Sequence, residues 1–426
     1  MGRGRPNANS ETSRPEPPFA VSASRTIIIG GGGIGGLTAA LALARSGFRT
    51  IVLEQATRPE EVGAGIQLTP NATRILNDLG LGARLRQSAV TPTGVRVREA
   101  ASGDEITRIP LDDAEQRYGA PFWVIHRGDL YAALLDAARG HPDVTLEFGA
   151  RVETFASHSN GVIVKAMRGT TAVDAQGVGY VGADGIWSAT RTFLLETKPP
   201  KFAGRVAWRA TVATDTAPPS MRAPEINLWL GHEKHLVHYP VHNGHAINIV
   251  AIAAGTWNET GWSAPGTPEE VLAQFPAGHW SRHARDLLGM PEHWHKWALA
   301  HAPVPRHWSR DQITLLGDAA HPMLPFLAQG AAMAIEDAAV LARRLAATPD
   351  DLSGAMKLYE LDRRSRTTKV QRAARKNGRV YQYRGPDAAV RNFVMRRIGG
   401  AMIRKRLDWI YNWRDDASAL AEQRPA

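Results

Sequence analysis

A strand, turn, helix, strand pattern near the N-terminus constrains the fold of this chain more than any other feature. The apolar residues 27–29 are followed by the sequence GGGGIGG, an Ala/Leu-rich segment at 37–45 and a second apolar segment at 50–53. This order is typical of a βαβ unit, in which a helix connects two parallel strands. The pattern therefore predicts an α/β domain built on a parallel sheet.

Three glycines and one acid within this unit indicate a nucleotide site. Gly31, Gly33 and Gly36 fit the G-x-G-x-x-G spacing, which permits a tight turn and a close approach of the backbone to a pyrophosphate. Glu54 ends the second strand, 18 residues after Gly36, where its carboxylate can hold ribose hydroxyls and repel a 2′-phosphate. The unit predicts FAD or NAD rather than NADP; the alternative is an accidental Gly-rich turn.

A second block, GDAAHPMLPFLAQGAAMAIEDAAVLARRL at 317–345, narrows the choice of cofactor. The apolar residues 313–316 predict a strand that ends at Gly-Asp, and the pair Gln329-Gly330 opens a long Ala-rich helix. Asp318 at the strand end can accept hydrogen bonds from sugar-like hydroxyls, and the helix N-terminus leaves free N–H groups for electron-rich ring oxygens. A flavin with its ribityl chain offers both partners, so this block favours FAD.

Length and composition set the broad class. A chain of 426 residues exceeds one ordinary core and implies two joined domains, or one large α/β domain with a substrate layer. The absence of cysteine excludes disulfides, iron–sulfur clusters, thiolate metal sites and cysteine nucleophiles, and is compatible with the cytoplasm. No apolar run reaches the roughly 18 residues of a membrane-spanning helix. Residues 1–24, rich in Arg, Pro, Ser and Asn, predict a disordered tail without the apolar core of a signal peptide.

The net charge of +10 is concentrated in one segment. Residues 363–406 hold fifteen Lys/Arg and one acid, Asp387, so this segment accounts for the whole excess. A solvated helix face or an intersubunit surface is the ordinary explanation, and attraction of an anionic substrate is a second. No nucleic-acid partner is expected, because few aromatic residues are interleaved with the basic ones to stack on bases.

Between the two nucleotide blocks the pattern changes to strand-like segments, at 161–166, 205–212, 226–230, 235–241 and 246–254. They predict a mainly antiparallel sheet that roofs a pocket. We expect an FAD-binding domain at 25–195 and 305–350, with part of 65–120 near the substrate. A substrate-binding sheet domain is expected at 196–304 and a C-terminal helical region at 351–426.

A third block, GYVGADGIWSATR, supplies Asp184 and makes the chain recognisable. With G-x-G-x-x-G, Asp-Gly and Gly-Asp fingerprints in that order, the chain resembles the single-component FAD-dependent aromatic hydroxylases, in particular the branch of salicylate hydroxylase and 3-hydroxybenzoate 6-hydroxylase. Phrases such as GAGIQLTPNATRIL, HRGDLYAALL, GRVAWRA, HYPV and WIYNW extend the resemblance over most of the chain. The resemblance implies a Rossmann-like FAD-binding domain with an inserted substrate sheet.

The resemblance also assigns cofactor contacts residue by residue. It implies that Glu54 binds the adenosine ribose and that Val152 meets the adenine through its backbone. Arg127 is expected near the phosphate and ribityl region, with a surface or interdomain ion pair as the alternative. The resemblance also implies that Gly31, Gly33 and Gly36 contact the pyrophosphate and that Asp318 binds the ribityl hydroxyls. Gly330 and Ala331 are implied at the pyrimidine edge of the flavin, and the Pro325 backbone is implied to face the hydroperoxide. Asp184 belongs to the block that, in this family, serves both FAD and the nicotinamide donor.

The implied reaction is hydroxylation of a small phenolic or carboxylated aromatic ring. NADH or NADPH reduces FAD as a transient donor, dioxygen adds to the flavin, and the hydroperoxide transfers one oxygen atom to the ring. Such a site needs a base near the phenol and shielding from water. The expected partners are therefore a small aromatic substrate and dioxygen, with no membrane partner, and the family makes a homodimer the candidate assembly.

The histidine-rich segment GHEKHLVHYPVHNGH at 231–245 supplies the candidate base. On a strand, His235 and Tyr239 share one face while His232 and His238 share the other, so no three ligands converge and no metal site is expected. His235 is the candidate base or proton relay and Tyr239 its hydrogen-bonding partner, as in related hydroxylases with a His-x-x-x-Tyr pair beside the substrate hydroxyl. His238 is the rival, because a one-residue register error exchanges the faces.

Further polar residues are candidates for substrate contact. Gln329, just before a predicted helix N-terminus, is expected to hydrogen-bond the substrate, with a purely structural role as the alternative. Arg209 is a weaker candidate for binding a substrate carboxylate, and His321 is expected to be structural. The alternative functions are hydroxylation or epoxidation of an N-heterocycle or other ring, and a non-hydroxylating or nucleic-acid-associated flavoprotein.

Overall fold

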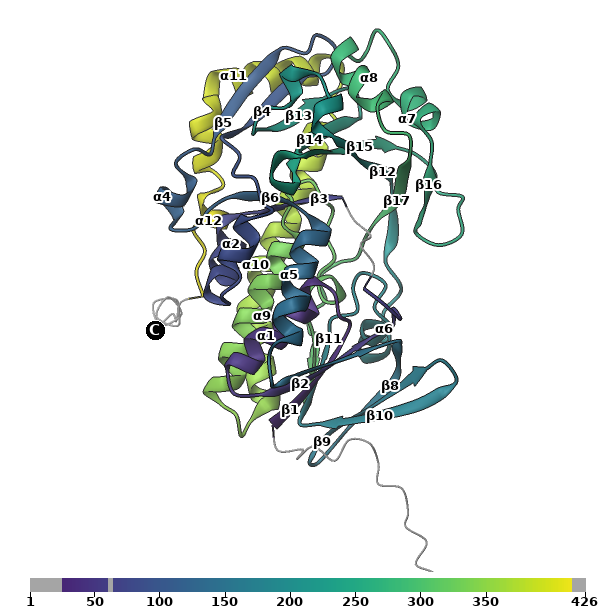
Figure 1. Ribbon diagram of the computed structural model, residues 1–426, viewed down its shortest axis with the longest axis vertical. Helices are drawn as coiled ribbons and strands as arrows, with labels where there is room; N and C mark the ends of the chain where they lie inside the picture. The colour runs from purple at the N-terminus through teal and green to yellow at the C-terminus, as the bar shows by residue number, and fades with distance from the viewer. Residues whose placement is uncertain (1–24, 60–63, 416–426) are drawn as a thin grey trace, which may run out of the picture.

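The computed structural model describes residues 25–59 and 64–415, so the tail predicted at 1–24 lies outside the described residues. Two sheets dominate the molecule, a six-stranded sheet at one end and an eight-stranded sheet at the other (Figure 1). The long helix α10 (Leu352–Tyr381) runs between them. The expected α/β fold with an inserted, mainly antiparallel sheet and a C-terminal helical region is confirmed.

The six-stranded sheet carries the N-terminal glycine turn. Its order is β18 (Ser309–Arg310), β19 (Ile313–Leu315), β11 (Gly179–Gly182), β1 (Thr26–Gly30), β2 (Arg49–Glu54) and β7 (Val144–Phe148), and only β18 pairs antiparallel. Helices α1 (Ile34–Arg45) and α9 (Gly330–Ala347) share its core with the small antiparallel sheet of β8 (Ala150–His158), β9 (Gly161–Arg168) and β10 (Thr171–Gly177). All three isoleucines at 27–29 are fully buried. Cover on both faces of β1 explains their unbroken apolar run.

The eight-stranded sheet contains the expected insertion and two strands from the N-terminal part of the chain. Its order is β16 (Ser263–Gly266), β17 (Trp294–His301), β12 (Lys201–Ala213), β15 (Ala246–Ala254), β14 (His235–Val241), β13 (Ile226–Leu230), β4 (Gly94–Glu99) and β5 (Glu105–Pro110). Every neighbouring pair is antiparallel except β13 and β4. The strands predicted at 226–230, 235–241 and 246–254 are confirmed at both ends.

The two faces of this sheet have different neighbours. Helices α7 (Pro268–Gln274) and α8 (Arg282–Gly289) share a hydrophobic core with one face, to which Leu236 of β14 belongs. His235, Val237 and Tyr239 of the same strand line a cavity on the other face. The period of two along a strand therefore separates the supporting face of the sheet from the face that holds the candidate site.

The remaining elements connect the two sheets. Gly65 N donates to Asn248 Oδ1 of β15 at 2.6 Å, which joins the short sheet of β3 (Gly65–Leu68) and β6 (Trp123–His126) to the eight-stranded sheet. The other helices are α2 (Pro70–Asp78), α3 (Gly82–Arg86), α4 (Ala114–Tyr118), α5 (Arg127–Arg139), α6 (Ala189–Leu195), α11 (Gly385–Lys405) and α12 (Asp408–Tyr411). Within the described ranges, no helix is long and apolar enough to cross a membrane.

The basic segment at 363–406 is only partly the solvated helix face that its composition predicts. Arg363 is 1% exposed and forms salt bridges with Glu336 and Asp337 of α9. Arg404 is also buried and pairs with Asp113. Part of the positive charge is therefore neutralised inside the fold, where these guanidinium groups join the C-terminal helices to the rest of the molecule.

Candidate active site

A large cavity joins the two sheets. Its volume is about 1090 Å³, and it reaches from the glycine turn after β1 to the open face of the eight-stranded sheet. Residues predicted for the cofactor and for the substrate line the same space: Gly33, Arg127, Asp318, Pro325, Gly330 and Ala331 on one side, and His235, Tyr239 and Arg209 on the other.

The glycine turn leaves room for an anionic group at the start of α1. Gly31 has φ = 108°, and a Cβ there would lie 2.5 Å from the carbonyl oxygen of Ala183. A Cβ at Gly36 would lie 1.9 Å from the carbonyl oxygen of Gly31, so this glycine permits the tight contact of helix and turn. Gly33 has no neighbour within 4 Å of its Cβ position and faces the cavity. The N–H groups of the first turn of α1 can therefore meet a phosphate there.

Glu54 ends β2 beside this turn. Its Oε2 accepts a hydrogen bond from Gly32 N at 2.6 Å, and its Oε1 accepts one from Ala56 N at 2.8 Å. These bonds hold the carboxylate at the turn, and each oxygen keeps a second lone pair for a ribose hydroxyl. Val152 lies in β8 beside a register shift of the β8–β9 pair, on the small sheet rather than on the cavity wall.

The Gly-Asp loop presents a carboxylate to the cavity. The accessible surface of Asp318 lies on the cavity wall. Burial raises the pKa of this carboxyl, and His321 and Arg127 oppose the rise. Arg191 is buried and donates to three backbone carbonyl oxygens, two of them in this loop. Arg191 therefore fixes the loop that carries Asp318.

The turn that precedes α9 has a strained backbone. Ala328 has φ = 52°, in the left-handed region that residues with a Cβ rarely adopt, and its N–H donates to Pro325 O at 3.0 Å. Such a conformation persists only where the surroundings enforce it. The turn brings Pro325, Gly330 and Ala331 to the cavity wall, as the resemblance implies for a loop beside a flavin.

Asp184 holds the residues that follow it in the chain through hydrogen bonds to its carboxylate. Its Oδ1 accepts a hydrogen bond from Ser188 Oγ at 2.5 Å, and its Oδ2 accepts from both N and Oγ1 of Thr190 at 2.9 Å. The carboxylate thus fixes the start of α6, while the backbone at Ala183 and Gly185 lines the cavity. We infer that Asp184 shapes the wall of the cofactor site rather than contacting the cofactor with its side chain.

The Gln329 side chain does not face the cavity in which a substrate would bind. It is 1% exposed, its Nε2 donates to Thr69 Oγ1 at 3.0 Å, and its Oε1 accepts from Asn71 Nδ2 at 3.2 Å. Both ends of the amide are therefore engaged away from the cavity wall, and the structural alternative describes this side chain better. Thr69 and Asn71 were not singled out from the sequence, since their partners lie about 260 residues away.

His235 lies on the cavity wall and His238 on the opposite face of β14. His235 is 2% exposed, and its Nδ1 has no hydrogen-bond partner in the part of the chain that the structure describes. Its ring meets Phe326 and Tyr381 edge-on, with both ring centroids 5.5 Å away. Burial, and secondarily Arg205, lowers the pKa of His235 to about 3. A neutral imidazole at the cavity wall can accept a proton or a hydrogen bond from a ligand.

Tyr239 and Arg209 complete the polar part of this wall. Burial raises the pKa of Tyr239, so the phenol stays protonated. Burial also lowers the pKa of Arg209, an effect that Arg127 increases and Tyr239 opposes. The Nε of Arg209 is buried without a hydrogen-bond partner among the described residues, and its guanidinium lies 5.1 Å from the centroid of the Trp297 ring. An arginine remains charged in such surroundings, so its guanidinium can serve an anionic ligand in the cavity.

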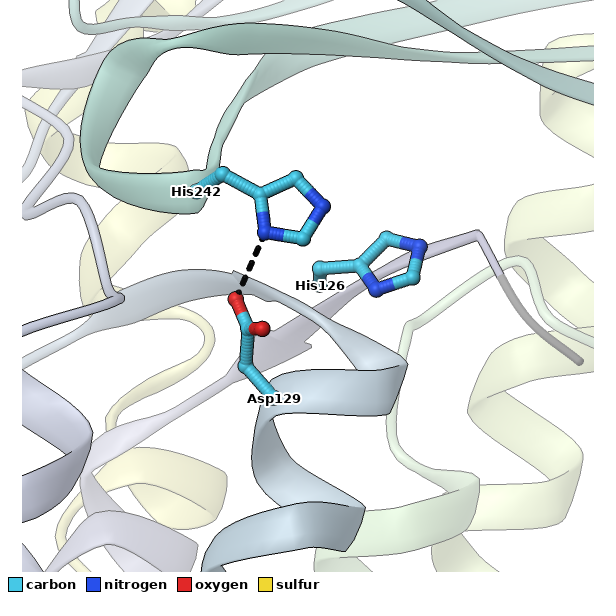
Figure 2. A group of neighbouring side chains, drawn as sticks. All are labelled: His126, Asp129 and His242. Atoms are coloured by element: carbon cyan, nitrogen blue, oxygen red, sulfur yellow. Dashed lines mark ion pairs between the residues drawn. The ribbon is translucent and has the colours of Figure 1, made fainter. Parts of the chain in front are cut away.

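A second polar cluster lies where α5 meets the turn after β14 (Figure 2). His242 Nδ1 lies 2.9 Å from Asp129 Oδ2, and the His242 ring stacks on that of His126 with centroids 4.4 Å apart. One ligand atom from each residue lies within 4.8 Å of the others, a spacing that could hold a metal ion. However, His126 and Asp129 stand at the positive N-terminal end of α5, and the stacked rings do not converge on a point. We interpret the cluster as a contact that holds the β14–β15 turn on α5.

These residues fit FAD. The open position at Gly33, the carboxylate of Asp318 and the helix N-terminus at Gly330 all face the cavity, in positions suited to pyrophosphate, ribityl hydroxyls and a ring carbonyl. The other end of the cavity is mainly apolar, with His235, Tyr239 and Arg209 as its polar groups on the sheet. That combination can bind a flat aromatic ring and orient it by a few polar contacts.

Comparison with known proteins agrees with this fit. Residues 23–374 match the model of the FAD binding domain family. The chain is 37% identical over 394 residues to 3-hydroxybenzoate 6-hydroxylase of Klebsiella oxytoca, covering 92% of this chain and 97% of that relative. It is 38% identical over 392 residues to a 3-amino-4-hydroxybenzoate 2-monooxygenase of Streptomyces platensis, covering 91% and 96%. The crystal structure of HpxO from Klebsiella pneumoniae with FAD and uric acid has a TM-score of 0.80 at 25% identity and covers 90% of this chain and 95% of its own.

Removing the Asp318 carboxylate should weaken cofactor binding. Asp318→Ala should weaken FAD binding about 100-fold or more, because two hydrogen bonds to a charged group, of about 1.5–3 kcal/mol each, would be lost. The flavin content after purification and the dissociation constant of added FAD measure this effect. Asp311→Ala, at an exposed position just before the same strand, is the control. Full flavin occupancy in Asp318→Ala would contradict the assigned role of Asp318.

Mild acid should destabilise the fold through His238 as well as His235. Burial, and secondarily Arg98, lowers the pKa of His238 to about 3, whereas an unfolded histidine has a pKa of about 6.5. Below a pH of about 6.5 the two histidines bind protons in the unfolded state but stay neutral in the folded state. The free energy of unfolding should therefore fall as the pH drops below about 6.5. His235 and His238 contribute about equally to this decrease in stability, so His238→Leu should remove roughly half of their joint contribution. The measurement is urea unfolding at neutral and mildly acidic pH; an unchanged pH dependence would show that His238 is not buried as a neutral group.

Proposed function

This chain belongs to the FAD binding domain family of flavoproteins, and we propose that its substrate is a phenol that carries a carboxylate. The enzyme is an FAD-dependent aromatic monooxygenase that uses NADH or NADPH as a transient electron donor and dioxygen as the oxidant. The observation that supports the substrate is that Gly33, Asp318 and Gly330 line the same cavity as His235, Tyr239 and Arg209.

Bound FAD supplies the redox chemistry, because it takes electrons from NAD(P)H and activates dioxygen for transfer of one oxygen atom to the ring. The chain itself supplies orientation, proton handling and exclusion of water. The apolar side chains of β4, β13 and β15 on the cavity wall, such as Val97, Leu228 and Ile252, surround the ring and keep water from the reacting atoms.

Arg209 is the group that we assign to the substrate carboxylate. Among the described residues, its Nε has no hydrogen-bond partner, and the residue lines the cavity. A guanidinium at a cavity wall binds a carboxylate better than a neutral group, because its hydrogen bonds are then charge-assisted. Arg127 on the other side of the cavity adds a second positive charge that attracts anionic ligands.

His235 is the group that we assign to the substrate hydroxyl. Its pKa of about 3 makes it a weak base but leaves it neutral at working pH, and the residue lines the cavity, where its imidazole can accept the phenolic proton as the substrate ring is attacked. Tyr239 lies four residues away, about 13 Å along the strand. We therefore infer that the two groups contact different parts of the bound ring rather than each other, which revises the direct pair that the sequence predicts.

A second candidate is hydroxylation of an N-heterocycle. The structural relative that binds uric acid supports it, since its fold matches over most of both chains. Hydroxyl and ring N–H groups would meet His235 and Tyr239 in the same way, so the two candidates differ in what Arg209 binds. We also propose that the enzyme acts as a homodimer in the cytoplasm, where NADH and NADPH are available.

The activity test follows NADH and NADPH oxidation by the purified protein against salicylate, the hydroxybenzoates, hydroxynicotinate, urate and phenols, with product and peroxide quantified. One carboxylated phenol should stimulate donor oxidation and yield a hydroxylated product. Stimulation only by a heterocycle would select the second candidate. A flavin-containing protein that no ring stimulates would contradict both.

Removing the His235 imidazole should uncouple donor oxidation from hydroxylation. His235→Ala should keep FAD and oxidise NAD(P)H, yet lower the rate of product formation about 100-fold, the usual scale for a lost proton-transfer group. The measurement is product formed per donor consumed. His238→Leu is the matched control on the opposite face of the same strand and should keep the wild-type yield. An unchanged yield in His235→Ala would move the proton-accepting role to another group.

Removing the Arg209 guanidinium should weaken binding of carboxylated rings selectively. Arg209→Met should raise KM for the carboxylated substrate about tenfold or more, because a charged hydrogen bond contributes about 1.5–3 kcal/mol. The corresponding phenol without a carboxylate should show little change. Arg310→Met, at an exposed position outside the cavity, is the control. An equal rise of KM for both substrates would argue against a carboxylate contact.

A further inference from the structure

We propose that Asn71 is a positioning residue that keeps the N-terminus of α9 open toward the flavin, through a hydrogen-bonded ring with Thr69 and Gln329. The proposal rests on the proposed function, since it assumes FAD in the cavity. It assigns roles to buried residues of the segment Thr69-Pro70-Asn71, at the start of α2, none of which lines the cavity itself.

The three side chains form a closed ring of hydrogen bonds. Thr69 Oγ1 donates to Asn71 Oδ1 at 2.6 Å, Asn71 Nδ2 donates to Gln329 Oε1 at 3.2 Å, and Gln329 Nε2 donates to Thr69 Oγ1 at 3.0 Å. Each is at most 1% exposed. The ring fixes the orientation of both amides, because exchanging O and N in either amide would place two donors or two acceptors together.

Gln329 is the N-cap residue of α9, yet its side chain does not cap that helix. An N-cap side chain commonly accepts a hydrogen bond from the second or third N–H of its own helix. Here both amide atoms of Gln329 are bound to α2 and the residue before it, so the first N–H groups of α9 are left for a ligand. Gly330 and Ala331 carry such groups and line the cavity.

Asn71 also joins this ring to a buried ionic cluster. Its Nδ2 donates to Glu336 Oε1 at 2.7 Å, one and a half turns into α9. Glu336 is fully buried and forms salt bridges with Arg363 and Arg366 of α10, both at N–O distances of 2.6–2.7 Å. Asn71 therefore binds α9 at two points, at its N-cap Gln329 and at the buried Glu336. The salt bridges of Glu336 hold the second point in place, which restricts movement of Asn71 and of Gln329.

This geometry has a consequence for the bound cofactor. Free N–H groups and the positive end of a helix stabilise the negative charge that the pyrimidine edge of a flavin gains on reduction. Loosening Gln329 would let its side chain turn back and cap α9, in competition with the flavin for the same N–H groups. Asn71 would then influence the reduction potential of the cofactor without touching it.

The test compares Asn71→Leu with Thr69→Val, a milder change that breaks the same ring, and with Asn77→Leu, an exposed control on α2. The reduction midpoint potential of bound FAD, the FAD dissociation constant and the product formed per donor consumed are measured on flavin-loaded protein. We expect both ring variants to shift the reduction equilibrium about tenfold toward the oxidised form, or ~30 mV for a two-electron couple. They should also lower the product yield, while Asn77→Leu stays at wild-type values.

Each outcome decides one question. If Thr69→Val lowers the melting temperature but leaves the reduction potential of FAD and the product yield unchanged, the ring is merely structural and the proposal is overturned. This result decides the question even if Asn71→Leu fails to fold. A wild-type protein that takes up no FAD would overturn the proposed function instead. Wild-type hydroxylation with an unaltered Thr69→Val potential would leave the proposed function standing and remove this inference alone.

Discussion

The salt bridges between Arg363 of α10 and the two adjacent carboxylates of α9 are the interaction on which the rest of this structure depends. Arg363 lies 2.7 Å from Glu336 and 2.6 Å from Asp337, and all three side chains are at most 1% exposed. Burial alone would raise the pKa of Asp337, but His321 and Arg363 together lower it to about 2. Loss of one partner from such a cluster costs about 3–5 kcal/mol, because the other charges are left buried and unpaired.

The two carboxylates, Glu336 and Asp337, hold different parts of the candidate cofactor site. Asp337 Oδ2 accepts from Gly317 N at 2.9 Å and contacts His321 Nε2 at 2.6 Å, so it holds the loop that carries Asp318. Glu336 holds Asn71 and, through it, the start of α9. One buried ionic cluster thus determines where both cofactor-facing features lie. It also explains why His321, despite its place in the Gly-Asp motif, is structural.

The sequence predicted the parts of the site that depend on local geometry. The glycine spacing predicted the turn because Gly31 needs a positive φ and Gly36 needs a missing Cβ, and both requirements are visible within a few residues. Strand periodicity likewise placed His235 and Tyr239 on one face and His238 on the other. Gln329 was harder to interpret, because the direction of its amide is decided by Thr69 and Asn71, far away in the chain. The same holds for Arg363 in the basic segment and for His242 beside Asp129, whose partners the chain order does not reveal.

The position of the cavity between two sheets makes its polar groups interdependent. Asp318 lies in the loop that follows β19 of the sheet with the glycine turn, and Gly330 opens α9 beside it. His235, Tyr239 and Arg209 belong to strands of the other sheet, so the distance between cofactor and substrate depends on how the two sheets are joined. Helix α10 contacts both parts of the molecule: Arg363 in its first half pairs with Glu336 of α9, and Tyr381 at its end packs against His235 with ring centroids 5.5 Å apart. The Gly65–Asn248 hydrogen bond joins the eight-stranded sheet to the short sheet of β3 and β6, and the His242–Asp129 contact joins it to α5. We therefore expect that a substitution in α10 distant from the cavity can change the position of His235 relative to Asp318 and Gly330 without changing any of these side chains.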